Sequence, residues 1–172
     1  MFDVDVFIDD CKQALKATEP RRAIRETLSR ATAEPSAVTA ALDHDTGALT
    51  PLYRGDDLTI LNVVWSPGMV LRPHDHRMWA CIGIYAGQED NAFFRRDHGT
   101  ITTSGGKELH ERDVLLLGDD AIHSVTNPLR SCTGAIHVYG GDFFAQPRSQ
   151  WDPETFEEQP YDIDAVLKQF AE

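Results

Sequence analysis

The sequence lacks any apolar run approaching the roughly 20 residues that a membrane-spanning helix needs, so we do not expect a transmembrane protein. Its first residues, MFDVDVFIDD, carry acids early and have no positive n-region, so a secretory signal is not expected either. Cysteine is scarce: Cys11, Cys81 and Cys132 follow no motif spacing. An odd number of cysteines without a secretion signal predicts reduced thiols and a cytoplasmic location.

Positive charge is also in short supply. The chain has 16 Lys and Arg against 28 Asp and Glu, which gives a formal net charge of -12 with neutral histidines. An acidic surface repels nucleic acid and anionic lipid, so neither nucleic acid nor a membrane is expected as a partner. No repeat, low-complexity tract or linker interrupts the 172 residues, which predict one domain over 1–172.

Residues 1–45 have a helical pattern. Apolar residues of the first segment recur on one helical face: Val4, Phe7, Ile8, Cys11 and Leu15. Pro20 and Pro35 each suit the first turn of a further helix, because proline is tolerated there. The sequence therefore predicts an N-terminal helical segment.

The sequence pattern changes from helical to strand-like near Ala48. Short β-rich runs such as LTILNVVW, MVLRPH, WACIGIY, AFFRRD, DVLLLG and AIHVYG alternate with turn formers such as SPG, AGQEDN, SGGK and NPLRS. Strands at this spacing predict a mainly β barrel or sandwich over residues 48–145. Residues 146–172 are expected to form a C-terminal extension with a short helix in DIDAVLKQFA.

Two histidines, His74 and His76, stand at the edge of one predicted strand in RPHDHRMWACIGIYAG. Residues i and i+2 of a strand point to the same face, so both rings would project to one side and Asp75 to the other. Buried imidazoles need partners for their nitrogens, and a shared metal ion would serve both rings. A further histidine, His123 in GDDAIHSVTN, follows another β-rich run and precedes Asn127 by four positions.

The layout of these residues resembles the cupin superfamily. Gly68, five residues and His74-x-His76 are similar to the first cupin motif, and His123, three residues and Asn127 are similar to the end of the second. The resemblance covers roughly residues 52–144 and implies a double-stranded β-helix of the jelly-roll type. The proline-x-glycine turn of the second motif is replaced by DDAI.

The usual cupin glutamate ligand, four or five residues after the second histidine, is missing, because Ala80 and Cys81 stand there. Three neutral imidazoles leave a divalent ion with its full charge, which favours an anionic ligand and lowers the pKa of a bound thiol. Within the cupins this pattern resembles the cysteine dioxygenase-type thiol dioxygenases. The resemblance implies iron(II) held by His74, His76 and His123.

A tryptophan, a tyrosine and a histidine also match that family. Trp79 fits the HDHxxW pattern of bacterial-type members, and the resemblance implies that it contacts the substrate. Tyr139 and His137, in AIHVYGGDF, are similar to an active-site tyrosine and the histidine that orients it. A hydrogen-bonded pair in the core is the alternative for these two residues.

Arg54, in LYRGDD, corresponds to an upstream arginine that would bind a substrate carboxylate through its planar guanidinium. A surface ion pair with Asp56 or Asp57 is the alternative. Other arginines that could take the same role are Arg72, Arg77, Arg95 and Arg96.

Cys81 has two interpretations. Mammalian-type members of the family have a cysteine near this point that crosslinks to the tyrosine. When the family's cysteine position is aligned from His76, it falls on Cys81, and when it is aligned back from Gly87, it falls on Ala80. A crosslink to Tyr139 and plain core packing therefore both stay open, with packing favoured. Glu89, in AGQEDN, is expected to be a charged hairpin residue.

The resemblance implies a mononuclear non-haem iron(II) dioxygenase that oxidises a small carboxylate-bearing thiol, such as cysteine or 3-mercaptopropionate, to its sulfinic acid with O2. A metal-binding cupin without oxygenase activity, such as a sensor, and a non-oxygenase cupin enzyme, such as an isomerase, are the alternatives. Histidine ligands alone do not identify the metal, because any such site binds the divalent first-row metals in the same order of affinity. A monomer or a homodimer is expected.

Overall fold

The computed structural model describes residues 1–171. Three helices come first: α1 (Val4–Ala14), α2 (Pro20–Thr32) and α3 (Pro35–Thr39). The strands that follow are β1 (Ala48–Arg54), β2 (Thr59–Trp65), β3 (Val70–Asp75), β4 (Ala80–Ala86), β5 (Gln88–Asp97), β6 (Thr100–His110), β7 (Val114–Leu117), β8 (Ile122–Thr126), β9 (Thr133–Tyr139), β10 (Ser149–Trp151) and β11 (Glu158–Pro160). The described part ends with α4 (Ile163–Ala171).

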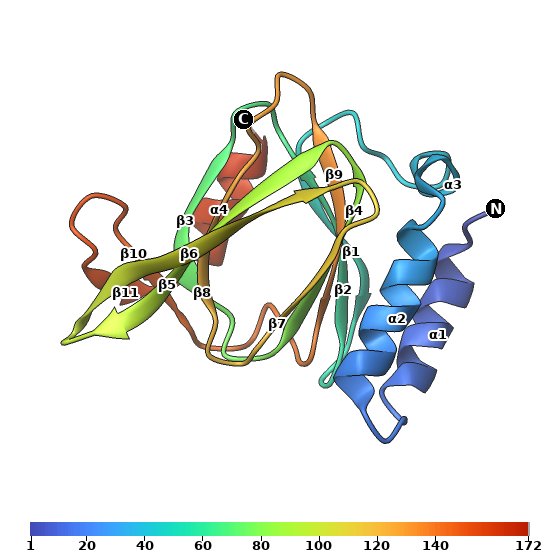
Figure 1. The fold of residues 1–172 in the computed structure, drawn as a ribbon, viewed down its shortest axis with the longest axis horizontal. Helices are drawn as coiled ribbons and strands as arrows, with labels where there is room; N and C mark the ends of the chain where they lie inside the picture. Colours follow the sequence, from blue (N-terminus) through green and yellow to red (C-terminus); the bar gives the residue numbers. More distant parts are fainter. Residues whose placement is uncertain (172) are drawn as a thin grey trace.

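The strands form two antiparallel sheets that face each other (Figure 1). One sheet has the order β1-β2-β9-β4-β7, and the other has the order β11-β10-β3-β8-β5-β6. The pairs β2·β9, β3·β8, β4·β7 and β5·β6 are the nested pairs of a double hairpin wound into a jelly roll. This strand order confirms the predicted mainly β double-stranded β-helix.

The sheet that contains β2, β9 and β4 is buried on both faces. In β9, Ala135 and Tyr139 belong to the core between the sheets, whereas Ile136 and Val138 belong to a second core under the helices. Helices α1 and α2 cover this outer face (Figure 1), with Phe7, Cys11 and Leu28 as buried contacts. Because alternate residues point to opposite faces, one strand can contribute to both cores.

The helices begin where the sequence predicts. The Asp3 side chain caps α1 by accepting a hydrogen bond of 3.0 Å from the Val6 amide. Pro20 and Pro35 occupy the first turns of α2 and α3, where the missing amide hydrogen costs nothing.

Three predictions of turns or coil were wrong. AGQEDN was predicted as a turn, but residues 88–91 open strand β5, and SGGK lies inside β6, where the register shifts opposite Phe93 and Phe94. Strands β1, β10 and β11 were not predicted. β1 and β11 each contain a proline and a charged residue, which weaken a strand pattern, and β10 has only three residues. The miss at residues 88–91 matters for the site.

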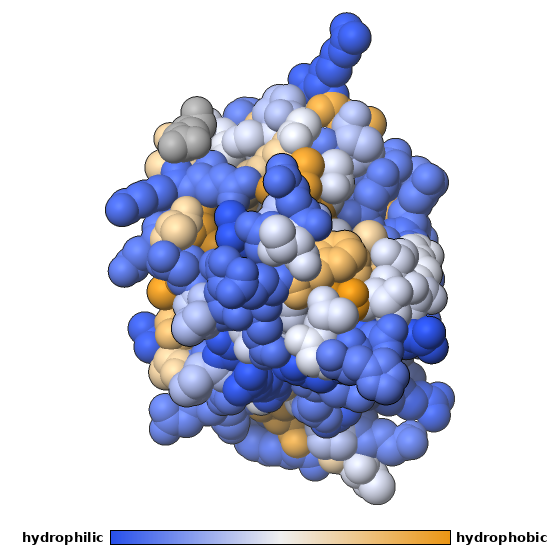
Figure 2. All heavy atoms as spheres, turned by 90° about the vertical axis from the view of Figure 1, so that its left-hand side faces the viewer, coloured by the Kyte–Doolittle hydropathy of each residue, from blue (hydrophilic) through white to orange (hydrophobic). Residues whose placement is uncertain are grey.

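The face over β10, β11 and the end of β5 and β6 is mostly hydrophilic, with a few paler and apolar atoms near its centre (Figure 2). Ion pairs bridge its strands: Arg96 contacts Glu158 at 2.9 Å and Asp75 at 3.7 Å. Among residues 1–171, no helix is both long and apolar enough to cross a membrane.

Leu28 tests the contact between α2 and the sheet. It is fully buried, and a Cβ built on Gly83 of β4 would lie 2.8 Å from Leu28 Cγ, so the leucine rests directly on the strand. Leu28→Ala should lower the free energy of unfolding by about 2–5 kcal/mol through lost burial and a cavity. Urea denaturation measures this, with the half-exposed Leu167→Ala as the control. Equal losses in the two variants would contradict the packing described above.

Candidate metal centre

Three imidazoles meet between the sheets. His74 lies near the end of β3 and is directly opposite His123 of β8 in the antiparallel register, while His76 follows β3 by one residue. The ring centroids are 4.7 Å apart for His74 and His123, and 5.0 Å apart for the other two pairs. One nitrogen from each ring lies within 4.8 Å of the others, so the three rings can hold one metal ion.

All three rings are buried, and burial is the main cause of their shifted pKa values. It lowers the pKa of His74 to about 4, although a hydrogen bond to the Arg72 carbonyl opposes the shift. The pKa values of His76 and His123 are also well below the usual value, because of burial and then the neighbouring imidazoles. Neutral imidazoles are the form that binds a metal ion.

The hydrogen bonds of the rings fit this role. His74 Nδ1 lies 2.9 Å from the Arg72 carbonyl oxygen, so Nδ1 carries the hydrogen and Nε2 has a free lone pair. His123 Nδ1 lies 2.7 Å from Asn91 Oδ1. Within residues 1–171, the buried atoms His123 Nε2 and His76 Nδ1 have no hydrogen-bond partner. Such orphaned nitrogens are costly unless something binds them, and a metal ion fits this donor set.

Asp75, between the two histidines of the motif, takes no part in the cluster. Its carboxylate accepts a hydrogen bond of 2.7 Å from the Ser149 amide and pairs with Arg77 at 3.3 Å. Its side chain therefore points to the opposite face of β3, as the alternation of the strand predicts.

A small cavity of about 20 Å³ is lined by the His74 and His123 rings. This volume holds one or two water molecules, so a thiol must displace lining side chains when it binds. Val166 and Phe170 of α4 lie on one side, and Phe170 stacks on Trp65 at 5.1 Å. The polar side chains that line the cavity are those of His74, His123, His137, Tyr139 and Tyr161.

A second polar cluster joins the two sheets beside the rings. Glu89 of β5 is fully buried, and its Oε2 lies 2.9 Å from Trp65 Nε1 and 3.3 Å from His137 Nε2. Its Oε1 accepts a hydrogen bond of 3.1 Å from Asn91 Nδ2. His137 Nδ1 is 2.9 Å from the Tyr139 hydroxyl, whose pKa is raised mainly by burial. Tyr139 therefore keeps its proton and faces His76 at a ring distance of 5.1 Å.

Arg148 is a buried cation behind Phe143 and Tyr161, and it is not itself among the residues that line the cavity. Its guanidinium carbon lies 4.2 Å from the ring centre of Phe143 and 4.0 Å from that of Tyr161, and both rings line the cavity. Nη1 donates to the Phe143 carbonyl, whereas Nε and Nη2 have no partner among the described residues. A buried guanidinium with two free donors is suited to bind an anion.

The structure does not bring Arg54 and Trp79 to the cavity. Arg54 forms a two-point ion pair with Asp142 at 2.9–3.1 Å, with half of its side chain exposed, so it matches the surface-pair alternative with a different partner. Trp79 belongs to the outer core under the helices and packs against Gly140. Neither residue is among those that line the cavity in residues 1–171.

Cys81 and Tyr139 are also kept apart. Ala80 pairs with Tyr139 and Cys81 with Val138 in the register of β4 and β9, so the Cys81 side chain points to the helices. Burial raises the pKa of the Cys81 thiol to about 12. The arrangement corresponds to core packing and leaves the thiol in its unreactive protonated form.

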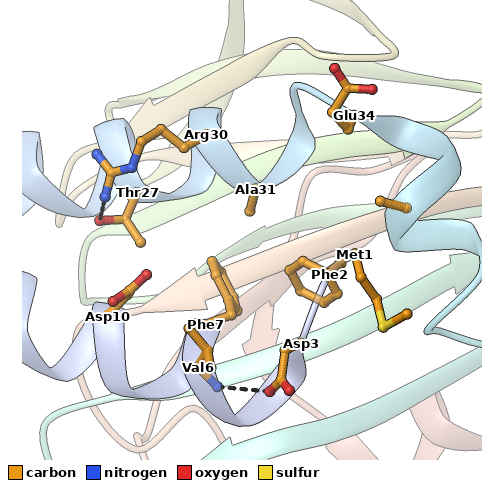
Figure 3. Close-up of a pocket in the computed structure, with 11 residues that line it drawn as sticks. Met1, Phe2, Asp3, Val6, Phe7, Asp10, Thr27, Arg30, Ala31 and Glu34 are labelled. Carbon is orange, nitrogen blue, oxygen red and sulfur yellow. Dashed lines mark hydrogen bonds between the residues drawn. The ribbon is translucent and has the colours of Figure 1, made fainter.

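A larger cavity of about 290 Å³ lies between α1 and α2 (Figure 3). Two of its polar contacts are local: Asp3 caps α1, and Arg30 donates to Thr27. The three-histidine cluster thus lies inside the barrel, well away from this larger hollow.

Sequence reasoning missed Glu89, Asn91 and Arg148. Glu89 and Asn91 lie two positions apart, the spacing that puts both on one face of a strand, but the surrounding AGQEDN was interpreted as a turn. Arg148 follows a proline in a stretch without strand periodicity. Its burial depends on Tyr161, thirteen positions later, and no local pattern signals that contact.

Comparisons with known proteins add little beyond the fold. No family model matches the chain. An oxalate decarboxylase variant from Bacillus subtilis is 16% identical over 53% of this chain and 23% of that chain, with a TM-score of 0.43. An RmlC-like cupin family protein from Methanocaldococcus jannaschii is 13% identical over 59% and 86%, with a TM-score of 0.47. The DMSP lyase DddQ from Ruegeria pomeroyi is 19% identical over 58% and 46%, with a TM-score of 0.45.

The buried histidines predict how the metal-free protein responds to acid. Unfolded His74 gains a proton near pH 6.5, whereas folded His74 stays neutral to about pH 4, so the unfolded state binds more protons between these values. The free energy of unfolding should therefore fall as the pH falls from 6.5 to 5, with a slope that rises from about 0.7 toward about 1.4 kcal/mol per pH unit for each such histidine.

Urea denaturation at pH 6.5, 5.75 and 5 measures this slope. His98→Gln is the control, because His98 is fully exposed and should leave the slope unchanged. A metal-free protein that is equally stable across this window would contradict the neutral, buried state of the rings.

Proposed function

We propose that this protein is a mononuclear iron(II) thiol dioxygenase of the cupin type that acts on a small thiol bearing a carboxylate. The observation that carries the proposal is the cluster of three neutral, buried imidazoles beside a small cavity, with no carboxylate in the cluster among residues 1–171. Bound iron(II) would supply the redox chemistry that joins a thiol and O2 into a sulfinic acid, RSH + O2 → RSO2H, in which sulfur is oxidised and oxygen reduced.

Each polar residue at the cavity has a role in this proposal. His74, His76 and His123 would hold the iron and leave positions open for substrate. Tyr139 lines the cavity, and its hydroxyl donates to His137 Nδ1 because His137 Nε2 donates to Glu89, so Tyr139 offers its hydroxyl oxygen to the cavity in a fixed direction. The aliphatic and aromatic lining, including Phe143, leaves room for very little water, which strengthens each polar contact in the site.

Arg148 takes the carboxylate-binding role in this proposal in place of Arg54. Its unpartnered Nε and Nη2 offer the two parallel donors that a carboxylate matches, whereas the donors of Arg54 are occupied by Asp142. The rings of Phe143 and Tyr161 hold the guanidinium on both sides. A carboxylate bound to Arg148 would keep the small thiol beside the histidines.

A non-oxygenase cupin enzyme and a passive metal-binding module remain the competing functions. The buried Arg148 and the Tyr139–His137 pair favour an enzyme with an anionic substrate, since a passive site needs neither. Oxygen uptake with cysteine, 3-mercaptopropionate and cysteamine, together with sulfinate analysis, separates the dioxygenase from both competing functions. Metal binding without thiol-dependent oxygen uptake would contradict the dioxygenase and leave the other two.

The ligand assignment predicts about one iron per chain after anaerobic loading. His76→Ala should remove most of this iron, because two remaining protein ligands make an incomplete site. Metal analysis after gel filtration measures the content, and His98→Ala is the exposed control. Full iron retention in His76→Ala would show that the three-histidine assignment is wrong.

The carboxylate anchor predicts a difference between two arginines. Arg148→Lys should lower kcat/KM for mercapto acids about tenfold to 150-fold, since hydrogen bonds to charged groups contribute roughly 1.5–3 kcal/mol, and should change cysteamine turnover little. Arg54→Lys should leave both substrate classes nearly unchanged, because its partner is Asp142. Steady-state kinetics on both thiol classes test this, and an equal loss for both classes in Arg148→Lys would make Arg148 a structural residue.

A further inference from the structure

We propose that Glu89, acting through Asn91, fixes the tautomer in which His123 presents a bare Nε2 to the metal, and is thus a positioning residue for the metal centre. The inference rests on the proposed metal site, not on the identity of the thiol. It follows from a continuous chain of hydrogen bonds: Glu89 Oε1 to Asn91 Nδ2 at 3.1 Å, and Asn91 Oδ1 to His123 Nδ1 at 2.7 Å.

The direction of each bond follows from what each group can do. A carboxylate only accepts, so Asn91 must turn its amide nitrogen to Glu89 and its oxygen to His123. An amide oxygen only accepts, so His123 Nδ1 must carry the hydrogen. The Nε2 atom of a neutral His123 is then a lone pair, and it is buried without a partner in residues 1–171. The Glu89 carboxylate therefore determines the tautomer of His123, which lies two hydrogen bonds away.

The backbone explains why these three residues meet. Phe93 of β5 lies directly opposite His123 of β8, and Asn91 and Glu89 are two and four positions before Phe93. All four side chains thus share the inner face of the sheet. The other oxygen of Glu89 accepts from Trp65 and His137 of the facing sheet, so the carboxylate is held from both sides of the core.

Glu89→Gln tests the polarity of this chain with little change in shape. Its amide oxygen should take the Oε2 position, because Trp65 Nε1 can only donate there and cannot reverse, whereas Asn91 can relieve a donor–donor contact by flipping its amide. The amide nitrogen then faces Asn91, which must flip and present its own nitrogen to His123. The hydrogen of His123 moves to Nε2, the atom that must bind the metal.

The second variant restores the polarity. In Glu89→Gln/Asn91→Asp, the glutamine nitrogen donates to the new carboxylate, which accepts from His123 Nδ1 as the native amide oxygen does. Co(II) affinity, measured by chelator competition and the visible spectrum, should fall about ten- to hundredfold in Glu89→Gln and recover most of that loss in the double variant. Glu108→Gln, at an exposed position of β6, is the control for loss of a negative charge.

The tautomer itself gives a readout that needs no metal. Long-range ¹H–¹⁵N spectra of metal-free protein should show the hydrogen of His123 on Nδ1 in the wild type and the double variant, and on Nε2 in Glu89→Gln. A wild-type hydrogen on Nε2 overturns the inference even if a variant fails to fold. Unchanged Co(II) affinity in Glu89→Gln, or no recovery in a folded double variant, also overturns it. Failure of the wild type to bind Co(II) would instead overturn the proposed metal site.

Discussion

Buried polar groups must find partners inside an otherwise apolar core, and the Glu89 carboxylate is where this constraint is most severe. Burying a carboxylate is costly unless hydrogen bonds compensate it, and Glu89 is met by donors from Trp65, Asn91 and His137. These donors come from both sheets, so the same contacts tie the sheets together and fix the side chains around the cavity. The orientation of His123 and of the Tyr139 hydroxyl depends on this arrangement.

The sheet that contains β2, β9 and β4 is buried on both faces, so one face can carry the polar residues of the site while the other packs against the helices. Odd-numbered positions of β9 supply Ala135, His137 and Tyr139 to the cavity side, and the even-numbered Ile136 and Val138 pack under α1 and α2. Cys81 and Trp79 are on the helix side for the same reason. The N-terminal helices therefore cover the sheet without touching the site, and the site can be polar while the outer core stays apolar.

Much of the fold followed from local pattern, since strand periodicity, turn formers and Pro20 and Pro35 act within a few residues. The His74 and His76 pair was predictable for a related reason, because the i, i+2 spacing is a property of one strand, whereas His123 followed from the resemblance to the second cupin motif. Glu89 and Arg148 were not predictable in this way. Glu89 stands among turn-forming polar residues and becomes a strand residue only through pairing with β6 and β8. Arg148 is buried by Phe143 and Tyr161, a contact that only tertiary packing creates.

The placement of Glu89 also has an electrostatic consequence. A carboxylate bound directly to a divalent ion would cancel part of its charge, whereas Glu89 acts on the centre through the neutral Asn91 amide. The three neutral imidazoles leave the charge of an ion in place, and the buried Arg148 adds a further positive charge near the cavity. Electrostatic interactions are strong in such a dry interior. Under the proposed function, these positive charges would favour a small ligand that carries negative charge, such as a thiolate with a carboxylate.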